Sequence, residues 1–180
     1  MELSLIERAL RIAALAHKDQ VRKEGDTPYI VHPVMVALDL KTRGFLDEIV
    51  AAALVHDVLE DTDFPEDQLE SELGSSVMEI VRAVTNDDSL SWEEKKLRYI
   101  ETVRSGSEGA KAVATADKIH NAKSLLAAHK QQGEVLWSHF KAGKEKKIWF
   151  ERAMLEMLKE TWESPLVSEY ESLVEEMAAL

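Results

Sequence analysis

The sequence contains no cysteine, and this absence removes disulfides, thiolate nucleophiles and cysteine-ligated zinc sites together. Any metal ion must therefore be held by histidine and carboxylate side chains. No apolar stretch approaches the roughly 20 residues needed to cross a bilayer, and the first residues lack a signal-peptide pattern. These absences predict a cytoplasmic protein that does not enter a membrane.

Glycine and proline are also scarce, with seven and four residues among 180, and aromatic residues make up only 6%. Few chain-breaking residues, together with 45% hydrophobic and 31% charged residues, favour a mostly helical globular fold. The length suits one domain with a complete hydrophobic core. We therefore predict an all-α fold in which residues 1–180 form a single domain.

Positive charge is in short supply too. The 22 lysine and arginine residues face 34 aspartate and glutamate residues, which gives a net charge of −12. Such a charge argues against DNA or RNA as partners and against binding to an anionic membrane. It still permits a small anionic ligand, provided that local cations and a metal ion outweigh the field of the whole protein.

What the chain does contain is an apolar run, residues 49–62 (IVAAALVHDVLEDT), that ends in one imidazole and three carboxylates. Its alanine and leucine content predicts a helix surrounded by other helices. On a continuous helix, His56 and Glu60 lie about 40° apart around the axis, as do Asp57 and Asp61, so the four form one polar patch. Three carboxylates repel one another at the negative end of a helix dipole, which predicts a cation among them.

A second polar interruption falls within residues 111–128 (KAVATADKIHNAKSLLAA), which also predict a helix. Asp117, His120 and Asn121 are spaced so that they share one face of it. The alanines on either side of Asp117 allow another helix to approach closely, and an unpaired buried carboxylate is too costly to keep. Asp117 therefore needs a partner.

Residues 19–31 (DQVRKEGDTPYIV) contain a glycine and a proline and predict a loop with a short extended piece at Tyr29 to Val31. Arg22 and Lys23 form the first adjacent cationic pair of this acidic chain, and on spacing alone they are either a solvated turn or an anion contact. His32 follows directly, before a proline that suits the first position of a helix.

Taken together, His32, His56, Asp57 and Asp117 would supply a metal-binding set of two imidazoles and two carboxylates. This mixture of nitrogen and oxygen ligands suits Mn²⁺, Fe²⁺ or Zn²⁺ and suits Ca²⁺ poorly. A bound divalent ion lowers the pKa of water. Glu60 and Asp61, one helical turn further along, could orient that water or transfer its proton.

Other polar residues have simpler explanations. His17 lies on the core-facing stripe of a helix that begins at Ser4, where a hydrogen-bonded structural role is favoured over a role beside the site. The lysine-rich segment 139–147 (HFKAGKEKK) is best explained as a solvated helix start over aromatic core residues, with a flexible phosphate or base contact as the alternative. Lys95 and Lys96 are interpreted as solvent-facing charges.

Three segments, VRKEGDTPYIVHP, ALVHDVLEDT and TADKIHNAKSL, resemble the hydrolase domain of the RelA/SpoT homologues in the HD phosphohydrolase superfamily. Their order and separations are similar to those of the stand-alone small alarmone hydrolases, and the resemblance covers roughly residues 5–160. It implies an all-helical HD fold, one Mn²⁺ ion, and removal of the 3′-pyrophosphate from ppGpp or pppGpp to give GDP or GTP. The helix expected over residues 165–178 would pack on this domain.

The resemblance also implies roles for individual residues. The family's metal ligands match His32, His56, Asp57 and Asp117. Its catalytic acidic pair matches Glu60 and Asp61. Its phosphate and nucleotide contacts match Arg22, Lys23, Asn121 and Ser124.

Two departures affect the loop and the C-terminal part. Glu24 replaces a serine that is common in the family, and the loop before Pro28 is one residue longer. The lysine-rich segment aligns poorly as well. The His56-Asp57 pair and the Glu60-Asp61 pair, which relatives without hydrolase activity tend to lose, are both intact. No synthetase domain follows, so we expect degradation of the alarmone and not its synthesis.

Two other functions are compatible with the sequence. The same metal site could serve an HD phosphohydrolase of another nucleotide, such as a deoxynucleoside monophosphate or the 2′-phosphate of NADPH. Alternatively, the chain could be a non-catalytic sensor that binds ppGpp. The sequence is also compatible with a homo-oligomer but does not specify one.

Overall fold

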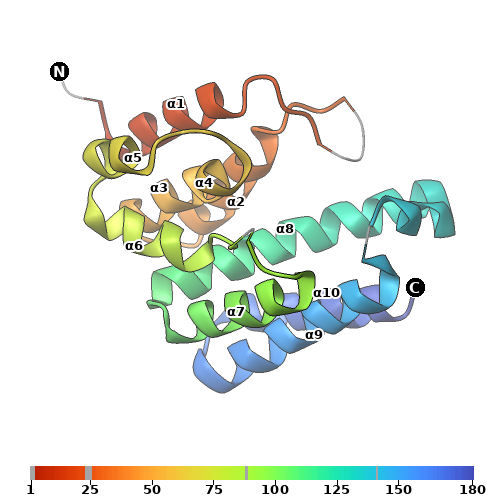
Figure 1. Ribbon diagram of the computed structural model, residues 1–180. Helices are drawn as coiled ribbons and strands as arrows, with labels where there is room; N and C mark the ends of the chain where they lie inside the picture. The colour runs from red at the N-terminus through yellow and green to blue at the C-terminus, as the bar shows by residue number, and fades with distance from the viewer. Residues whose placement is uncertain (1–2, 23–25, 88, 141) are drawn as a thin grey trace.

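The computed structural model describes residues 3–22, 26–87, 89–140 and 142–180 (Figure 1). Within these residues the chain forms ten α-helices and one 3-10 helix, and the only β-type pairing is an isolated bridge between Val21 and Pro28. The all-α prediction is confirmed. None of the described helices combines the length and the hydropathy that crossing a bilayer requires. The single-domain organisation of residues 1–180 stays a prediction.

The elements follow one another as α1 (Leu5–Ala16), α2 (Val31–Thr42), α3 (Asp47–Val55), α4 (Val58–Asp61), α5 (Glu66–Leu73), α6 (Ser75–Val84), α7 (Trp92–Ser105), α8 (Glu108–Gln132), η1 (Gly133–His139), α9 (Gly143–Thr161) and α10 (Pro165–Ala178). Several begin at a serine whose hydroxyl accepts a backbone N–H of the first turn. These capping residues include Ser4, Ser91 and Ser164.

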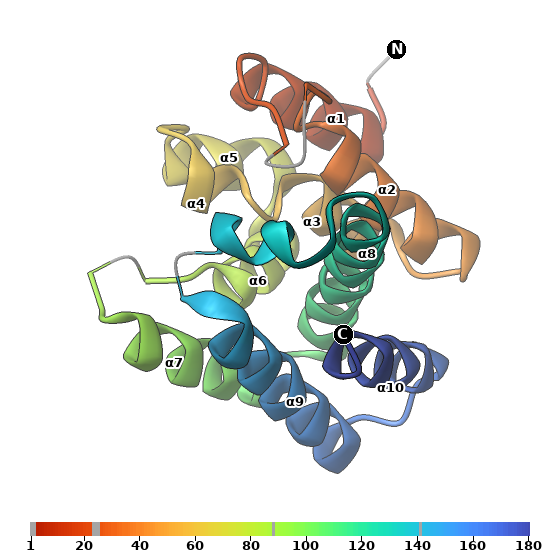
Figure 2. The same ribbon diagram turned by 90° about the vertical axis from the view of Figure 1, so that its right-hand side faces the viewer.

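The long helix α8 lies between two groups of helices (Figures 1 and 2). It contacts α2, α3 and α6 on one side and α7 and α10 on the other. Helix α10 also contacts α9, so the last helix packs on the rest as expected. Helix α8 carries small residues through its buried middle, including Ala112, Ala114 and Ala116, which lets neighbouring helices come close to Asp117.

Helix α3 is surrounded by protein, as its sequence predicts, and Ala51, Ala52 and Ala53 have no exposed surface. The prediction of one continuous helix through residue 62 is wrong, because α3 ends at Val55 and α4 starts only at Val58. The Nδ1 atom of His56 lies 2.8 Å from the Ala53 carbonyl oxygen. In a continuous helix that carbonyl would accept the N–H of residue 57, so the imidazole takes the place of a helical hydrogen bond.

The segment before α2 also differs from its prediction. Tyr29 and Ile30 form a turn and Val31 already belongs to α2, so no extended piece occurs there. The turn places His32 in the first turn of α2, instead of just ahead of the helix. Its side chain is almost fully buried and points toward the end of α3.

Candidate metal centre and active site

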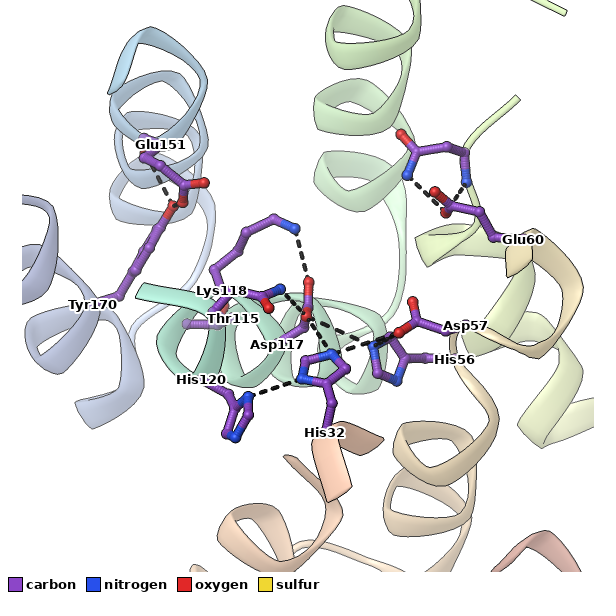
Figure 3. A network of polar contacts seen from close by, with 12 residues as sticks. His32, His56, Asp57, Glu60, Thr115, Asp117, Lys118, His120, Glu151 and Tyr170 are labelled. Atoms are coloured by element: carbon purple, nitrogen blue, oxygen red, sulfur yellow. Dashed lines mark hydrogen bonds and ion pairs between the residues drawn. The ribbon is translucent and has the colours of Figure 1, made fainter. Parts of the chain in front are cut away.

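His32, His56, Asp57 and Asp117 come together from α2, the α3–α4 junction and α8 (Figure 3). The Nε2 atom of His32 lies 3.1 Å from Asp117 Oδ1 and 3.5 Å from Asp57 Oδ2. The Nε2 atom of His56 lies 3.2 Å from Asp57 Oδ2 and 3.7 Å from Asp117 Oδ1. Ligand atoms about 2.1 Å from one metal ion and at right angles lie roughly 3 Å apart. One ligand atom each of His32, His56 and Asp57 lies within 4.8 Å of the other two, so these three suit a shared cation, and Asp117 Oδ1 lies beside both imidazoles.

His56 has the protonation pattern that a metal ligand requires. A carbonyl oxygen can only accept, so the contact with Ala53 O assigns the hydrogen to Nδ1 and leaves a lone pair on Nε2. That Nε2 atom is buried and has no hydrogen-bond partner within the described chain, although it faces two carboxylate oxygens. Acceptors facing one another need a cation between them, and a divalent metal ion fits this place.

The two carboxylates that face His56 also change the pKa of its imidazole. Burial lowers its pKa, but the charge of Asp57 and the contact with Asp117 outweigh burial and raise the pKa to about 9. Without a metal ion, a proton can therefore take the position of the cation.

His32 is oriented from behind by His120. The two Nδ1 atoms lie 2.8 Å apart, so one ring must donate and the other accept. Burial and the charges of His32 and Arg22 lower the pKa of His120 to about 4, which keeps its ring neutral and able to accept. His32 can then donate from Nδ1 and present the lone pair of Nε2 to the cluster.

Asp117 has its two oxygens in different environments. Oδ1 faces the imidazoles and accepts the amide N–H of Asn121 at 2.6 Å, whereas Oδ2 accepts from the Lys118 ammonium at 2.8 Å. Burial alone would raise the pKa of Asp117, but Lys118 and the two histidines hold it well below its ordinary value. Since Lys118 occupies Oδ2, Asp117 can offer one oxygen to a metal ion.

Glu60 and Asp61, predicted to lie in one patch with His56 and Asp57, diverge after the helix break. Glu60 Oε2 accepts from the backbone N–H and the side-chain amide of Asn86, at 3.1 and 2.8 Å, in the segment after α6. Figure 3 shows this carboxylate held away from the four candidate ligands. The predicted common patch is therefore wrong for Glu60 in this conformation.

Asp61 remains connected to the candidate ligands through Tyr29. The Tyr29 hydroxyl lies 2.6 Å from Asp57 Oδ2 and 3.0 Å from Asp61 Oδ2, so its single hydrogen can serve either carboxylate. Burial and the charge of Asp57 raise the pKa of Asp61 and also raise the pKa of the Tyr29 phenol. These contacts place a proton donor between the candidate ligand and the candidate acid.

The predicted substrate contacts are distributed over two neighbouring cavities. Arg22 lines both and donates to Asn121 Oδ1 at 3.2 Å. Asn121 lines the larger cavity, about 490 Å³, together with Tyr29, Asp61 and Lys147. Ser124 instead lines the smaller cavity, about 280 Å³. Lys23 and Glu24 lie outside the described residues.

Asn121 makes two side-chain contacts within the chain, and its predicted contact with the nucleotide stays a prediction. Its amide nitrogen donates to Asp117 and its oxygen accepts from Arg22. Asn121 therefore connects a candidate ligand to the segment before α2 that carries Arg22. The shared helix face predicted that Asn121 lies near Asp117, but the contact with Arg22 and the role of Tyr29 were not predicted, because they join segments that are distant in the chain.

His17 supports the site from behind, in agreement with the structural role favoured for it. Its Nδ1 atom lies 2.7 Å from Gln20 Oε1, and its ring lies 4.7 Å from that of Tyr29, centroid to centroid. Gln20 in turn donates to the backbone oxygen of Asp61 at 2.7 Å. The buried histidine thus helps to fix the loop that carries Tyr29.

Comparison with known proteins finds relatives that are similar in sequence. The mouse guanosine-3′,5′-bis(diphosphate) 3′-pyrophosphohydrolase MESH1 is 39% identical over 127 residues, which cover 69% of this chain and 71% of that protein. The guanosine-3′,5′-bis(diphosphate) 3′-pyrophosphohydrolase of Haemophilus influenzae is 38% identical over 120 residues, or 63% of this chain and 18% of that longer protein.

Two solved structures are similar along most of their length. A metazoan ortholog of SpoT, described as hydrolysing ppGpp and playing a role in starvation responses, superposes with a TM-score of 0.84 at 27% identity and covers 100% of this chain and 99% of its own. The lmo0812 protein of Listeria monocytogenes superposes with a TM-score of 0.77 at 33% identity, over 83% of this chain and 99% of its own. The HD domain model matches residues 9–144, and the chain therefore belongs to the HD domain family.

Proposed function

We propose that this protein is a metal-dependent hydrolase that removes the 3′-pyrophosphate from ppGpp or pppGpp and releases GDP or GTP. The observation that carries the proposal is the buried His56 Nε2 atom, which lacks a hydrogen-bond partner within the described chain and faces two carboxylates. The relatives named as guanosine-3′,5′-bis(diphosphate) 3′-pyrophosphohydrolases support the choice of substrate.

We infer that His32, His56, Asp57 and Asp117 hold the metal ion, and that Mn²⁺ is the native one, with Fe²⁺ or Zn²⁺ as the other candidates for this donor set. A bound divalent ion would supply Lewis-acid chemistry, lowering the pKa of water and drawing negative charge from a phosphoryl group. His120 and Lys118 keep His32 and Asp117 in the orientation that ligation needs.

The remaining residues act on the substrate and on protons. Arg22 lies at the boundary of both cavities, where its guanidinium can neutralise phosphate oxygens and offset the charge of an acidic protein. Asp61 and Tyr29 form a proton-holding pair beside Asp57. Glu60 would have to exchange its contact with Asn86 for one with water or substrate, which a rotation of its side chain allows.

A panel of nucleotides, incubated with the protein and Mn²⁺ and separated by chromatography, tests the proposal. The expected result is release of pyrophosphate from ppGpp or pppGpp, with no activity on 5′-monophosphates or on the 2′-phosphate of NADPH. Turnover of another nucleotide in preference to ppGpp would redirect the proposal to a different HD phosphohydrolase. Binding of ppGpp without any metal-dependent turnover would replace it with a sensor.

A further inference from the structure

Lys96 on α7 has an environment that the sequence did not predict. Its side chain is half-buried and not solvent-facing, and its ammonium lies 4.8 Å from the centre of the Phe150 ring and 6.0 Å from that of Tyr99. Its polar contact is the side-chain oxygen of Asn86, at 3.4 Å. Across the part of the chain that the structure describes, it forms no ion pair with a carboxylate.

A second ammonium group lies over the same two rings. Lys118 is 5.1 Å from the centre of the Tyr99 ring and 5.5 Å from that of Phe150. It differs from Lys96 in being neutralised directly by Asp117. Burial and the charge of Lys118 lower the pKa of Lys96 to about 8. Since a desolvated charge that is not paired directly with a carboxylate costs free energy, the position of Lys96 favours an anion from outside the chain.

The surroundings of Lys96 connect it to the candidate active site. Asn86 accepts from Lys96 and donates to Glu60, so it joins the lysine to the candidate acid. Lys147 on α9 is close enough to lower the pKa of Lys96 by its charge, and it lines the 490 Å³ cavity that also contains Arg22. Arg22 reaches that cavity from the loop before α2, whereas Lys147 reaches it from α9. Helix α7, which carries Lys96, lies beside α9 (Figure 2).

The charge balance of the site calls for such cations. Asp57 and Asp117 together cancel the two charges of a divalent ion, so that ion alone cannot balance a diphosphate group. Lys118 is paired with Asp117, and Lys147 has the buried carboxylate of Glu151 as a partner. Lys96 is therefore available to an incoming anion with the least rearrangement of existing pairs.

We propose that Lys96, assisted by Lys147, forms a second phosphate-binding position on the α7 and α9 side of the candidate metal centre. Its ligand class is a diphosphate group, which in the proposed reaction is the one that leaves as pyrophosphate. This inference rests on the proposed function for its substrate. The anion-binding position itself is argued from the burial and contacts of Lys96.

Titration calorimetry with inorganic pyrophosphate and the Mn²⁺-loaded protein tests the position directly. Lys96→Met should weaken pyrophosphate binding roughly tenfold or more, because a charge-assisted hydrogen bond is lost. Lys96→Arg should retain most of the affinity. The matched control is Lys146→Met, which removes a half-exposed lysine paired with Glu93 and should leave the affinity unchanged.

Mn²⁺ affinity and thermal unfolding of each variant separate binding from structure. The proposal requires that Lys96→Met keep the wild-type Mn²⁺ affinity and a cooperative unfolding transition. Wild-type affinity for pyrophosphate in Lys96→Met would overturn it, as would an equal loss in Lys96→Arg or a parallel loss of Mn²⁺ binding. Because these measurements need no turnover, a protein inactive on ppGpp would contradict the proposed function and still leave this test decisive.

Discussion

Buried charged groups lie on both sides of α8, but within the described residues they are fully paired on only one side. On the side of α2 and α3, Asp57 and two imidazoles converge with acceptor atoms facing one another. On the side of α9 and α10, Glu151 is also buried but is fully matched, since it accepts from Lys147 and from the Tyr170 hydroxyl. Figure 3 shows the contact with Tyr170. A polar cluster with every group paired stabilises a fold, whereas one that lacks a cation is suited to bind one.

Lys118 lies at the border between these two regions. Its ammonium bonds Asp117 and also lowers the pKa of Glu151 by its charge, although burial opposes that shift. The candidate metal centre is thus attached to a rigid, charge-matched support. The contact with Lys118 thus fixes the side chain of Asp117 through a group of the protein itself.

Removal of a candidate metal ligand should have the largest effect on metal affinity and on hydrolysis. In Asp57→Ala, we expect Mn²⁺ affinity to fall by more than the roughly 100-fold that loss of a supporting contact can cause, and ppGpp hydrolysis to fall to background. Metal content by mass spectrometry and product release measure the two effects. Chelation should lower the melting temperature of the wild type and not that of the variant. Full metal binding by Asp57→Ala would remove this residue from the ligand set.

The charge-matched region should respond in stability instead. Glu151→Leu leaves Lys147 and the Tyr170 hydroxyl without their buried acceptor, so the free energy of unfolding should fall by about 3 kcal/mol. Urea unfolding measures this loss, and Mn²⁺ affinity of the folded variant should stay near that of the wild type. A variant that loses metal binding but not stability would reverse the contrast between the two regions.

Glu60 tests whether the helix break removes a catalytic group from the site. Glu60→Gln should keep Mn²⁺ bound while kcat falls roughly 100-fold, as expected for loss of a general acid or base. Its amide can retain a hydrogen bond with Asn86, so stability should change little. Turnover at the wild-type rate would limit Glu60 to its present contact and leave Asp61 as the candidate acid.

The sequence predicted the type of secondary structure better than the helix breaks and the surroundings of individual side chains. Periodicity and capping residues predict an all-α fold, and residue type together with family resemblance selects four candidate ligands that do converge. The break at His56 was not predicted, because the apolar pattern of residues 49–62 continues through it and does not show that the His56 ring takes the carbonyl of Ala53. Tyr29 and Lys96 were missed for a related reason, since their surroundings depend on contacts between distant segments.

The smallest expected effect concerns the stability cost of Lys96. Burial first, and then the charges of Lys118 on α8, Lys147 on α9 and Lys95 on α7, lower its pKa from 10.5 to about 8, against the opposing charge of Glu60 on α4. The unfolded chain therefore binds this proton more tightly than the folded protein. Below pH 8 the folded state bears the whole cost of the ammonium, and the cost disappears as pH rises from 8 to 10.5.

Lys96→Met removes that cost and should stabilise the metal-free protein at pH 7, by about 1 kcal/mol after allowance for screening by water. Urea unfolding at pH 7 and pH 9.5 should show the gain shrinking at the higher pH, while Lys146→Met shows no such trend. A variant less stable than the wild type at both pH values would make Lys96 a residue that stabilises the fold. A gain in stability joined to a loss of pyrophosphate affinity is the pattern of a residue kept for binding at the expense of the fold.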